Sequence, residues 1–458
     1  MLDDMLDHLE HIRERPVWQP IPDTIRKSVR EPSPRAANAL ESVYAEFRRG
    51  ILPYATGNTH PGFMGWVHGG GTVVGMLAEM LAAGLNANLG GRDHMPIEVE
   101  RQVAEWAREW FSLPKGASGI FVTGTSMANL MAVLIARAEA LGGSVRTGGL
   151  DGARLRAYAS QAVHGCIARA MDFAGFGSDA LRLVPTDAMH RMDIAALGEA
   201  IAEDRKAGWL PFFVTGTVGA VDTGAIDDLE GLAELCRKEG LWCHIDGAFG
   251  ALAIWSQELA PRLAGIEHAD SIAFDFHKWG QVPYDAGFLL VRDGGKHRAA
   301  FASSAAYLRR ETRGLAAGSP WPCDLGPDLS RGFRALKTWF TLKTYGTDQL
   351  GRMIEQSCAL ARAAEAGIRA TPELELLAPA QLNIVCFRYL CEDADRINAE
   401  IVADLHERGR VAPSTTTIAG KLAIRAAFVN HRTQLCDVEA LVSEVLALGN
   451  EKTTRAAA

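Results

Sequence analysis

GIFVTGTSMANLMAVLIARAEAL, residues 119–141, decides the fold class: a strand-length apolar run ends at a glycine and opens into an apolar helical segment. The same order returns three times downstream: LRAYAS (155–160) before HGCIARAMDFAG (164–175), LRLVPT (181–186) before MDIAALGEAIAED (192–204), and PFFVTGTVG (211–219) before DDLEGLAELCRKEG (227–240). Strands that alternate with helices form a parallel sheet covered by helices on both faces. The sequence therefore predicts an α/β fold with a mainly parallel sheet.

Other regions are expected around that sheet. Residues 1–58 are predicted to form a helical arm, 59–345 a large domain and 346–450 a small C-terminal α+β domain. The last residues, 451–458, are expected to be a disordered tail. The Gly/Pro-rich stretch 314–327 predicts a long loop, of the kind that often forms a lid. An amphipathic arm seldom folds alone, so the arm is expected to pack on another subunit.

Composition and charge argue against several classes of partner and site. The formal net charge of −8 argues against a nucleic-acid or anionic-membrane partner. No apolar run approaches the roughly 18 residues that a membrane helix needs, and the charged start, MLDDMLDHLEHIRERP, lacks a signal-peptide core. The eight cysteines form no CxxC pair and no His/Cys metal spacing, so we expect reduced thiols, a cytoplasmic protein and no metal site.

Ligands of open α/β sheets bind at the carboxyl ends of the strands, and four predicted strand ends carry reactive side chains. At the first, Gly124, Thr125 and Ser126 open a helix, where free N–H groups and hydroxyls could hold an anion; the alternative is a glycine turn with a serine cap. At the second, His164 could stack on a ring or could be an ordinary cap or core histidine.

The other two strand ends carry ionisable groups. Asp246 closes the apolar run LWCHID, and a carboxylate there is costly to bury unless donors or a cation satisfy it. Small neighbours such as Ala248 would let a flat ligand approach the backbone; the alternative is an aspartate that caps a loop. Lys278 follows the run SIAFDF, and a lysine at this edge can act as a nucleophile toward carbonyls. Taken alone, it would be an ordinary surface lysine.

Together the four strand ends match the needs of one cofactor, pyridoxal 5′-phosphate (PLP). PLP needs a bound phosphate, a stacked ring, a partner for its protonated ring nitrogen and a lysine for its aldehyde. Asp246 is expected to hold the proton on the ring nitrogen, and Lys278 the aldehyde carbon.

The chain resembles the group II pyridoxal-dependent decarboxylases, which include aromatic amino-acid and glutamate decarboxylases. The resemblance runs from about His60 into the C-terminal domain. Its most specific part is the DGA…HKW pair, in which Asp246 and Lys278 lie 32 positions apart. The other matching stretches are HPGFMGWV (60–67), LNANL (85–89), VTGTSMANL (122–130), SQAVHGCIARA (160–170), TGAIDDL (223–229), LSRGFRALKTWF (329–340) and IRAAFVNHRT (424–433).

The resemblance implies a role for each matching residue. Lys278 would bind the cofactor covalently, Asp246 would pair with the ring nitrogen, and His164 and Ala248 would lie on the two faces of the ring. The phosphate would be bound by Thr125, Ser126 and His277, with Asp275 beside them. The resemblance also implies fold type I of PLP enzymes, decarboxylation of an L-amino acid to an amine and CO2, and a homodimer with active sites at the subunit interface.

Three departures from the family pattern bear on the reaction. The strand end Thr217–Val221 lacks a threonine that many members have. The expected substrate wall around Asn58, Asn88 and Gly90 is small and polar, and Arg92 and His94 follow it. This favours a less aromatic or more polar substrate. Arg92 could pair with a negative charge on that substrate or with Asp93 on the same loop.

The third departure is in the expected lid, where Trp321–Asp324 occupies the position of a tyrosine thought to protonate the substrate carbon. His94 or Asp324 of the partner subunit could replace that acid; otherwise O2 could react with the carbanion to give an aldehyde. An oxidative aldehyde synthase is therefore an alternative. An aminotransferase and a catalytically inactive PLP-binding protein are further alternatives, which the HKW context and the complete Lys278, Asp246 and His164 set disfavour.

Overall fold

The computed structural model describes residues 1–303 and 309–457, with side chains assigned in the last helix as far as Thr454. The chain divides into two compact units: Met1–Gly70 with Ser357–Ala458, and Gly71–Gln356. Within the described residues, no helix combines the length and the apolar character needed to cross a membrane.

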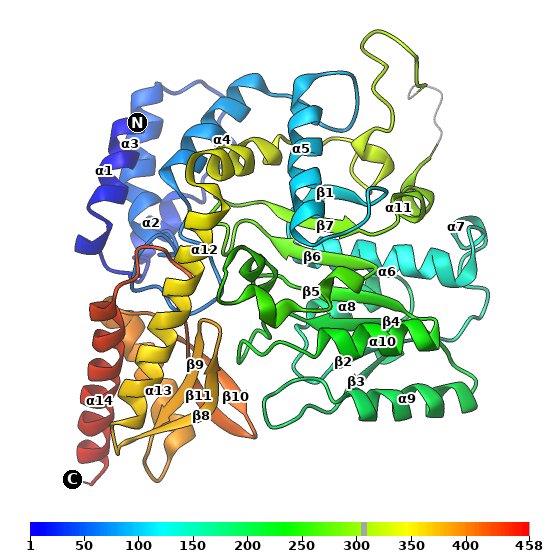
Figure 1. Cartoon of the computed structure of the whole chain (residues 1–458). Coiled ribbons are helices and arrows are strands. Elements are labelled where there is room, and N and C mark those ends of the chain that lie inside the picture. The colour runs from blue at the N-terminus through cyan, green and yellow to red at the C-terminus, as the bar shows by residue number, and fades with distance from the viewer. Residues whose placement is uncertain (304–308, 458) are drawn as a thin grey trace. The chain divides into compact units, whose positions relative to one another are not determined.

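The second unit is built on a seven-stranded sheet with the order β1-β7-β6-β5-β4-β2-β3 (Figure 1). β7 is antiparallel to both β1 and β6, and the other neighbours are parallel. The α/β class with a mainly parallel sheet is confirmed. The strands are β1 (Ser118–Val122), β2 (Leu155–Ser160), β3 (Leu181–Val184), β4 (Leu210–Thr217), β5 (Trp242–Asp246), β6 (Ser271–Asp275) and β7 (Gly287–Val291).

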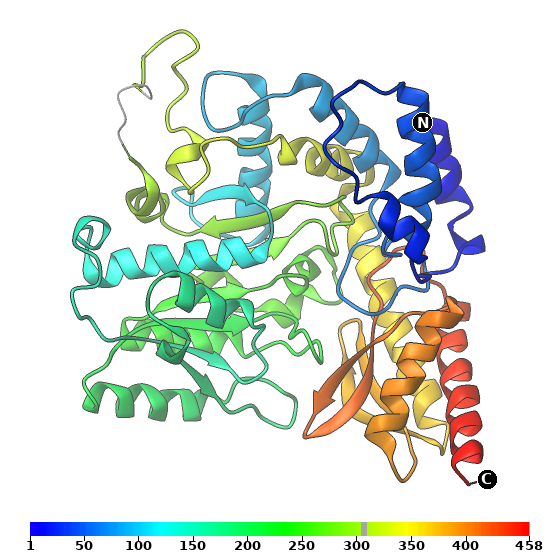
Figure 2. The same cartoon turned by 180° about the vertical axis from the view of Figure 1, so that it is seen from behind.

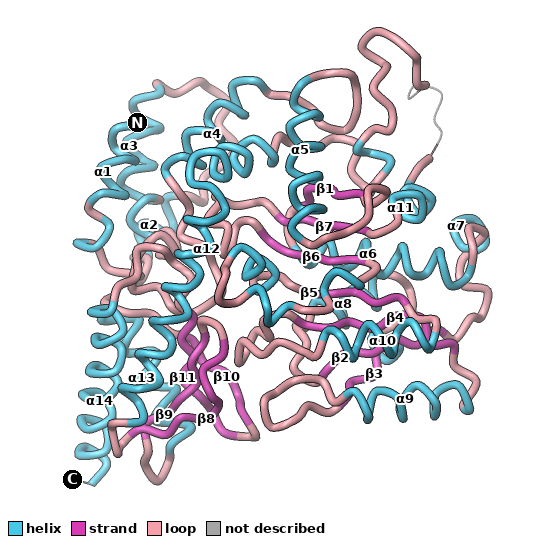
Figure 3. The backbone as a smooth tube through the Cα atoms, in the orientation of Figure 1, coloured by secondary structure: helices cyan, strands magenta, loops and turns pink. Residues whose placement is uncertain are grey.

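Helices cover both faces of this sheet (Figures 2 and 3). On one face α6 packs on β4 to β7 and α8 packs on α6, while α10 covers Gly216 and Ile245 on the other face. The helices of this unit are α4 (Val73–Leu85), α5 (Met95–Trp110), α6 (Thr125–Leu141), α7 (Val145–Gly148), α8 (Cys166–Phe173), α9 (Ile194–Lys206), α10 (Leu229–Glu239) and α11 (Gly294–Phe301). The long α12 (Arg334–Arg369) is broken at Gly346, whose φ of 71° is left-handed, and continues into the first unit.

A close backbone approach brings the start of α6 against the sheet. A Cβ on Gly287 would lie 2.3 Å from the Cα of Gly124, so the first position of β7 tolerates no side chain beside the start of α6. The apolar residues of β1 and α6, among them Ile120, Val122 and Met131, are buried in the core beneath. This packing puts the N-terminus of α6 at the edge where the parallel strands end.

The first unit contains a four-stranded antiparallel sheet with the order β10-β11-β9-β8. Its elements are α1 (Leu2–Glu10), α2 (Asp23–Ser28), α3 (Leu40–Gly50), β8 (Leu374–Gln381), β9 (Ile384–Tyr389), α13 (Ala394–Arg408), β10 (Ser414–Ile418), β11 (Lys421–Ala427) and α14 (Leu435–Ala457). The helical N-terminal segment and the C-terminal α+β region thus have the expected secondary structure.

The C-terminal tail differs from its prediction. Residues 451–457 continue α14 instead of being disordered, and Ala458 lies outside the described residues. Lys452 forms ion pairs with Asp404 at 2.7 Å and Glu400 at 3.3 Å, and alanine and arginine favour a helix. These long-range contacts extend the helix where the local composition indicated only a polar tail.

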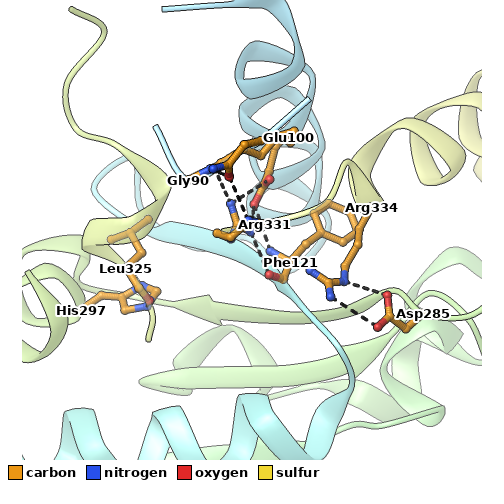
Figure 4. A network of polar contacts seen from close by, with 10 residues as sticks. Gly90, Glu100, Phe121, Asp285, His297, Leu325, Arg331 and Arg334 are labelled. Atoms are coloured by element: carbon orange, nitrogen blue, oxygen red, sulfur yellow. Dashed lines mark hydrogen bonds and ion pairs between the residues drawn. The ribbon is translucent and has the colours of Figure 1, made fainter. Parts of the chain in front are cut away.

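A buried ion pair ties the segment 88–91 to the sheet (Figure 4). Arg331 pairs with Glu100 of α5 and donates to the carbonyls of Leu89 (3.0 Å) and Phe121 of β1 (2.9 Å). Arg331 is 3% exposed and Glu100 4%, so removing one partner would leave a buried charge without compensation. The ion pair therefore fixes the loop that carries Asn88 relative to β1.

His297 holds the C-terminal part of the long loop after α11 (Figure 4). Its Nδ1 lies 2.7 Å from Ser118 Oγ and its Nε2 2.7 Å from the Leu325 carbonyl, so the neutral ring accepts from the serine and donates to the carbonyl. Complete burial lowers the pKa of His297 to about 4. The folded chain thus keeps this ring neutral where an unfolded chain would protonate it.

Replacing His297 is expected to change how stability depends on pH. Below about pH 6.5 the unfolded chain binds this proton, and the folded chain binds it only below about pH 4. The free energy of unfolding should therefore fall by about 1.4 kcal/mol per pH unit as the pH drops through this window. His297→Gln keeps a donor and an acceptor and should remove that contribution in urea unfolding at several pH values. The exposed His268→Gln is the matched control, and equal slopes in His297→Gln and the unsubstituted protein would contradict the assignment.

Candidate active site

The first cluster of the site lies where β6 ends. Asp275 is the last residue of β6 and is 2% exposed, and Lys278 follows in the next turn. The Lys278 ammonium lies 2.9 Å from Asp275 Oδ2, and Asp275 Oδ1 accepts from the backbone N–H of Thr125 at 2.8 Å. One carboxylate therefore joins the candidate nucleophile to the start of α6. Lys278 keeps 20% of its side chain exposed, which leaves its amine accessible.

The start of α6 offers donors for an anion. Thr125 is 4% exposed and its hydroxyl makes no hydrogen bond within the described residues, while Ser126 beside it is exposed. A buried hydroxyl without a partner costs free energy, so this one is suited to a ligand oxygen. The positive end of the 17-residue helix adds to the attraction for a negative group.

His277 is a neutral donor beside this cluster. Its Nδ1 accepts from the backbone N–H of Ala286 at 3.0 Å, and its ring packs against Tyr284 in a tilted arrangement with centroids 4.2 Å apart. Burial lowers the pKa of His277 to about 4, so the ring is neutral and its proton is on Nε2. Nε2 lies 3.6 Å from Asp275 Oδ2.

The second cluster surrounds Asp246 at the end of β5. Asp246 Oδ1 accepts from the Ala248 N–H at 3.1 Å, and Oδ2 accepts from the side-chain amide of Asn129 at 2.9 Å. Burial raises the pKa of this carboxyl group, and the positive charge of Lys278 acts in the opposite direction. A cationic ring nitrogen is a partner that would keep such a buried carboxylate ionised.

His164 precedes α8 and is exposed. Its Nδ1 accepts from the Cys166 N–H at 3.2 Å, which fixes the orientation of the ring. His164 lies close enough to Asp246 for its imidazole to lower the pKa of that carboxyl group. An exposed ring of fixed orientation is suited to stacking on a flat ligand.

Sequence reasoning missed three buried polar residues behind Asp246: Asn129, His244 and Ser271, each of which is 0% exposed. A signal was present, because the period-2 alternation of a strand puts Trp242, His244 and Asp246 of LWCHID on one face. Asn129, on α6, has no comparable local signal.

The expected substrate residues lie between α4 and α5. Asn88 Oδ1 accepts from the backbone N–H groups of Gly90 and Arg331, both at 2.9 Å. The Arg92 guanidinium packs on the ring of Trp321 at 4.6 Å, and His94 precedes α5 with a buried Nε2 that has no partner among the described residues. No hydrogen bond or ion pair joins these three to Lys278 within the part of the chain described.

The donor set fits PLP. Thr125, Ser126 and the neutral His277 would hold its phosphate, Lys278 its aldehyde carbon, and Asp246 its ring nitrogen. The unpartnered Thr125 hydroxyl and the accessible Lys278 amine are the observations in favour. Within residues 1–303 and 309–457 no group of three His, Cys, Asp or Glu side chains is placed to hold a metal ion.

Comparison with known proteins identifies the family. The model of the pyridoxal-dependent decarboxylase conserved domain matches residues 22–390. The chain belongs to the pyridoxal-dependent decarboxylase family. Its relatives within this family include the aromatic-L-amino-acid decarboxylase of Bacillus atrophaeus, 32% identical over 98% of this chain and 94% of the relative. The phenylacetaldehyde synthase of Arabidopsis thaliana is 28% identical over 93% of this chain and 90% of its own length.

Solved structures agree with this membership. The Oryza sativa TDC with PLP and tryptamine has a TM-score of 0.90 and 25% identity, and the match covers 98% of this chain and 96% of that one. The glutamate decarboxylase domain of a Vibrio parahaemolyticus enzyme has a TM-score of 0.87 and 28% identity, with 98% and 94% covered. The chain is a pyridoxal-dependent decarboxylase, a lyase of amino-acid metabolism whose cofactor is PLP.

Proposed function

We propose that this decarboxylase converts an L-amino acid into an amine and CO2, with Lys278 as the residue that binds the cofactor covalently. The observation that carries the proposal is the Thr125–Asp275–Lys278 cluster beside the buried Asp246, since each group meets a different need of one cofactor. When bound, PLP supplies an electron sink for the electrons left as CO2 departs.

The other residues hold and orient the reacting groups. Asp246 would accept a hydrogen bond from the protonated ring nitrogen and keep it charged, while Thr125, Ser126 and His277 would donate to the phosphate. Asp275 orients Lys278 and the Thr125 amide through contacts of 2.9 and 2.8 Å. His164 would stack on one face of the ring, and Ala248 would lie against the other.

We infer a substrate with a polar or anionic side chain. Arg92 makes no ion pair within the described residues and lines a pocket with Asn88 and Trp321, so its charge is available to a ligand. The backbone of Arg92 is left-handed, with φ of 97°. Arg92→Gln should raise KM for acidic amino acids more than for neutral ones, and an equal change for both would count against this role.

Of the two candidate acids, His94 suits protonation of the substrate carbon better than Asp324. Asp324 is 3% exposed, and its two carboxylate oxygens are occupied by Arg310 at 2.7 Å and Arg298 at 3.8 Å. His94 Nε2 makes no hydrogen bond within the described residues. Trp321 is 1% exposed and donates through Nε1 to the Ala317 carbonyl, so its side chain packs inside the loop of residues 314–327.

We also propose a cytoplasmic homodimer in which the arm of residues 1–58 contacts the partner subunit. Within the first unit, α3 has no buried residue and exposes Leu40 and Val43. Within the second unit, the apolar helix α4 exposes Met80, Leu81 and Leu85. Exposed apolar surface of this kind marks an interface. Light scattering should give twice the chain mass of 49.4 kDa, and a monomer would contradict the proposal.

A substrate panel tests the reaction itself. Purified holoenzyme is incubated with individual L-amino acids while CO2, amine and dissolved oxygen are measured. We expect equal amounts of CO2 and amine without oxygen consumption. Stoichiometric oxygen uptake with aldehyde and ammonia would instead identify the oxidative reaction, which the similarity to phenylacetaldehyde synthases makes the second candidate. A keto acid product would indicate transamination.

A further inference from the structure

A continuous line of hydrogen bonds runs behind Asp246, inside the second unit. Trp242 Nε1 lies 2.8 Å from Ser271 Oγ, which lies 2.8 Å from His244 Nδ1. His244 Nε2 lies 2.8 Å from Asn129 Oδ1, and Asn129 Nδ2 lies 2.9 Å from Asp246 Oδ2. Ser271, His244 and Asn129 are 0% exposed, so the line is sealed from water. We call these four residues behind Asp246 (Trp242, Ser271, His244 and Asn129) the relay.

The strand register assembles the relay. Trp242, His244 and Asp246 are alternate residues of β5 and point to one face of the sheet. Ser271 is the register partner of His244 on the neighbouring β6. α6 covers this face and supplies Asn129 one turn after its start, so the amide can contact both His244 and Asp246.

The relay has a single direction. The indole N–H of Trp242 can only donate, so Ser271 accepts it and can give its own hydrogen to His244 Nδ1. Burial lowers the pKa of His244 to about 3, so the ring is neutral and its one proton is on Nε2. That N–H faces the Asn129 carbonyl oxygen and turns the amide NH2 toward Asp246.

We propose that Asn129 and His244 are positioning residues that keep Asp246 a charged acceptor for the ring nitrogen of the cofactor. This inference rests on the proposed role of Asp246. Burial favours the neutral carboxyl group, and an amide with its oxygen toward Asp246 would favour it further. The fixed tautomer of His244 prevents that arrangement, because its Nε2–H requires the amide oxygen.

Thr215 provides a matched control for the relay. It is 0% exposed and is the register partner of His244 on β4, but its hydroxyl makes no hydrogen bond within the described residues. Thr215→Val therefore removes a buried hydroxyl at the same depth without touching the relay. Ser271→Ala and Asn129→Leu each interrupt the relay at a different point.

The first test measures the dissociation constant of PLP for these variants by titrating the apoenzyme and following the visible absorbance of the bound cofactor. Asn129→Leu should weaken binding by about ten- to hundredfold, the range expected for losing a hydrogen bond to a buried charge. Thr215→Val should stay within about twofold of the unsubstituted protein. Equal weakening in both variants would show that burial alone matters and would overturn the proposal.

The second test reads the histidine tautomer directly by ¹⁵N NMR of histidine-labelled holoenzyme, with the His244 signals assigned from their absence in His244→Gln. We expect a protonated Nε2 and a bare Nδ1 from about pH 5 to about pH 8, and a mixed tautomer in Ser271→Ala. An Nδ1–H form in the unsubstituted protein would overturn the inference even if Asn129→Leu fails to fold. Neither test needs a substrate, so a negative substrate panel with an intact relay would contradict the proposed function alone.

Discussion

Lys278→Ala is expected to abolish decarboxylation while the fold remains intact. Among the described residues, the Lys278 amine is the only lysine amine that forms an ion pair with Asp275, at a distance of 2.9 Å. Without that amine the cofactor has no covalent attachment, and an essential covalent group accounts for several orders of magnitude in rate. Stability should fall by about 1–3 kcal/mol, because the buried Asp275 loses its cation but keeps the hydrogen bond from the Thr125 N–H.

Three measurements check this expectation: CO2 release, visible absorbance of the purified protein, and retention of PLP through gel filtration. The variant should lose the absorbance of the lysine-bound cofactor and should release PLP on the column. Lys278→Arg is the matched control, since it keeps the positive charge beside Asp275 but cannot form the covalent link. If Lys278→Ala retained the absorbance, the assignment of the lysine would be wrong.

Asp246→Asn is expected to cause the second largest loss, at least about 10³-fold in kcat. The substitution keeps the shape of the side chain and removes the charge that holds the ring nitrogen in its protonated form. Such a loss corresponds to about 4 kcal/mol of transition-state stabilisation, a usual size for a buried electrostatic contact. The effect should be larger on kcat than on KM, because the charge would stabilise the electron pair that stays behind when CO2 leaves.

A buried carboxylate on α9 serves as the comparison. Asp204 is 6% exposed and accepts from the Tyr158 hydroxyl at 3.0 Å. Asp204→Asn makes the same chemical change at similar burial, and we expect it to lower stability without a comparable loss in kcat. Steady-state rates and urea unfolding on both variants separate the two effects. A similar fall in kcat for both would indicate a general effect of burial.

Much of the candidate site could be predicted from the sequence, because its residues lie at or just after the ends of predicted strands. Asp246, Asp275 and Lys278 each come at or just after an apolar run, and parallel strands bring their carboxyl ends to one edge. The sequence did not reveal that Asp275 joins Lys278 to the Thr125 amide, because 150 residues separate the two ends of that hydrogen bond. The antiparallel direction of β7 was also not predicted.

The predicted substrate residues make contacts that the sequence did not reveal. Asn88 was expected to face a substrate, yet its side-chain oxygen accepts two backbone N–H groups from Gly90 and Arg331. Arg92 was weighed against a pair with Asp93, whereas its observed contact is the ring of Trp321. Both contacts join loops far apart in the chain, and loop conformation depends on such contacts more than on local sequence.

The sequence by itself determined the α/β class, the family and the set of chemical groups at the strand ends, because residue periodicity and residue type are local properties. Only the tertiary structure decided which donor meets which acceptor. The direction of the relay depends on β5, β6 and α6 packing so that Trp242, Ser271, His244 and Asn129 lie within hydrogen-bond distance. The surroundings of Lys278 also depend on packing, because tertiary structure brings Asp275 and the Thr125 N–H at the start of α6 together beside it.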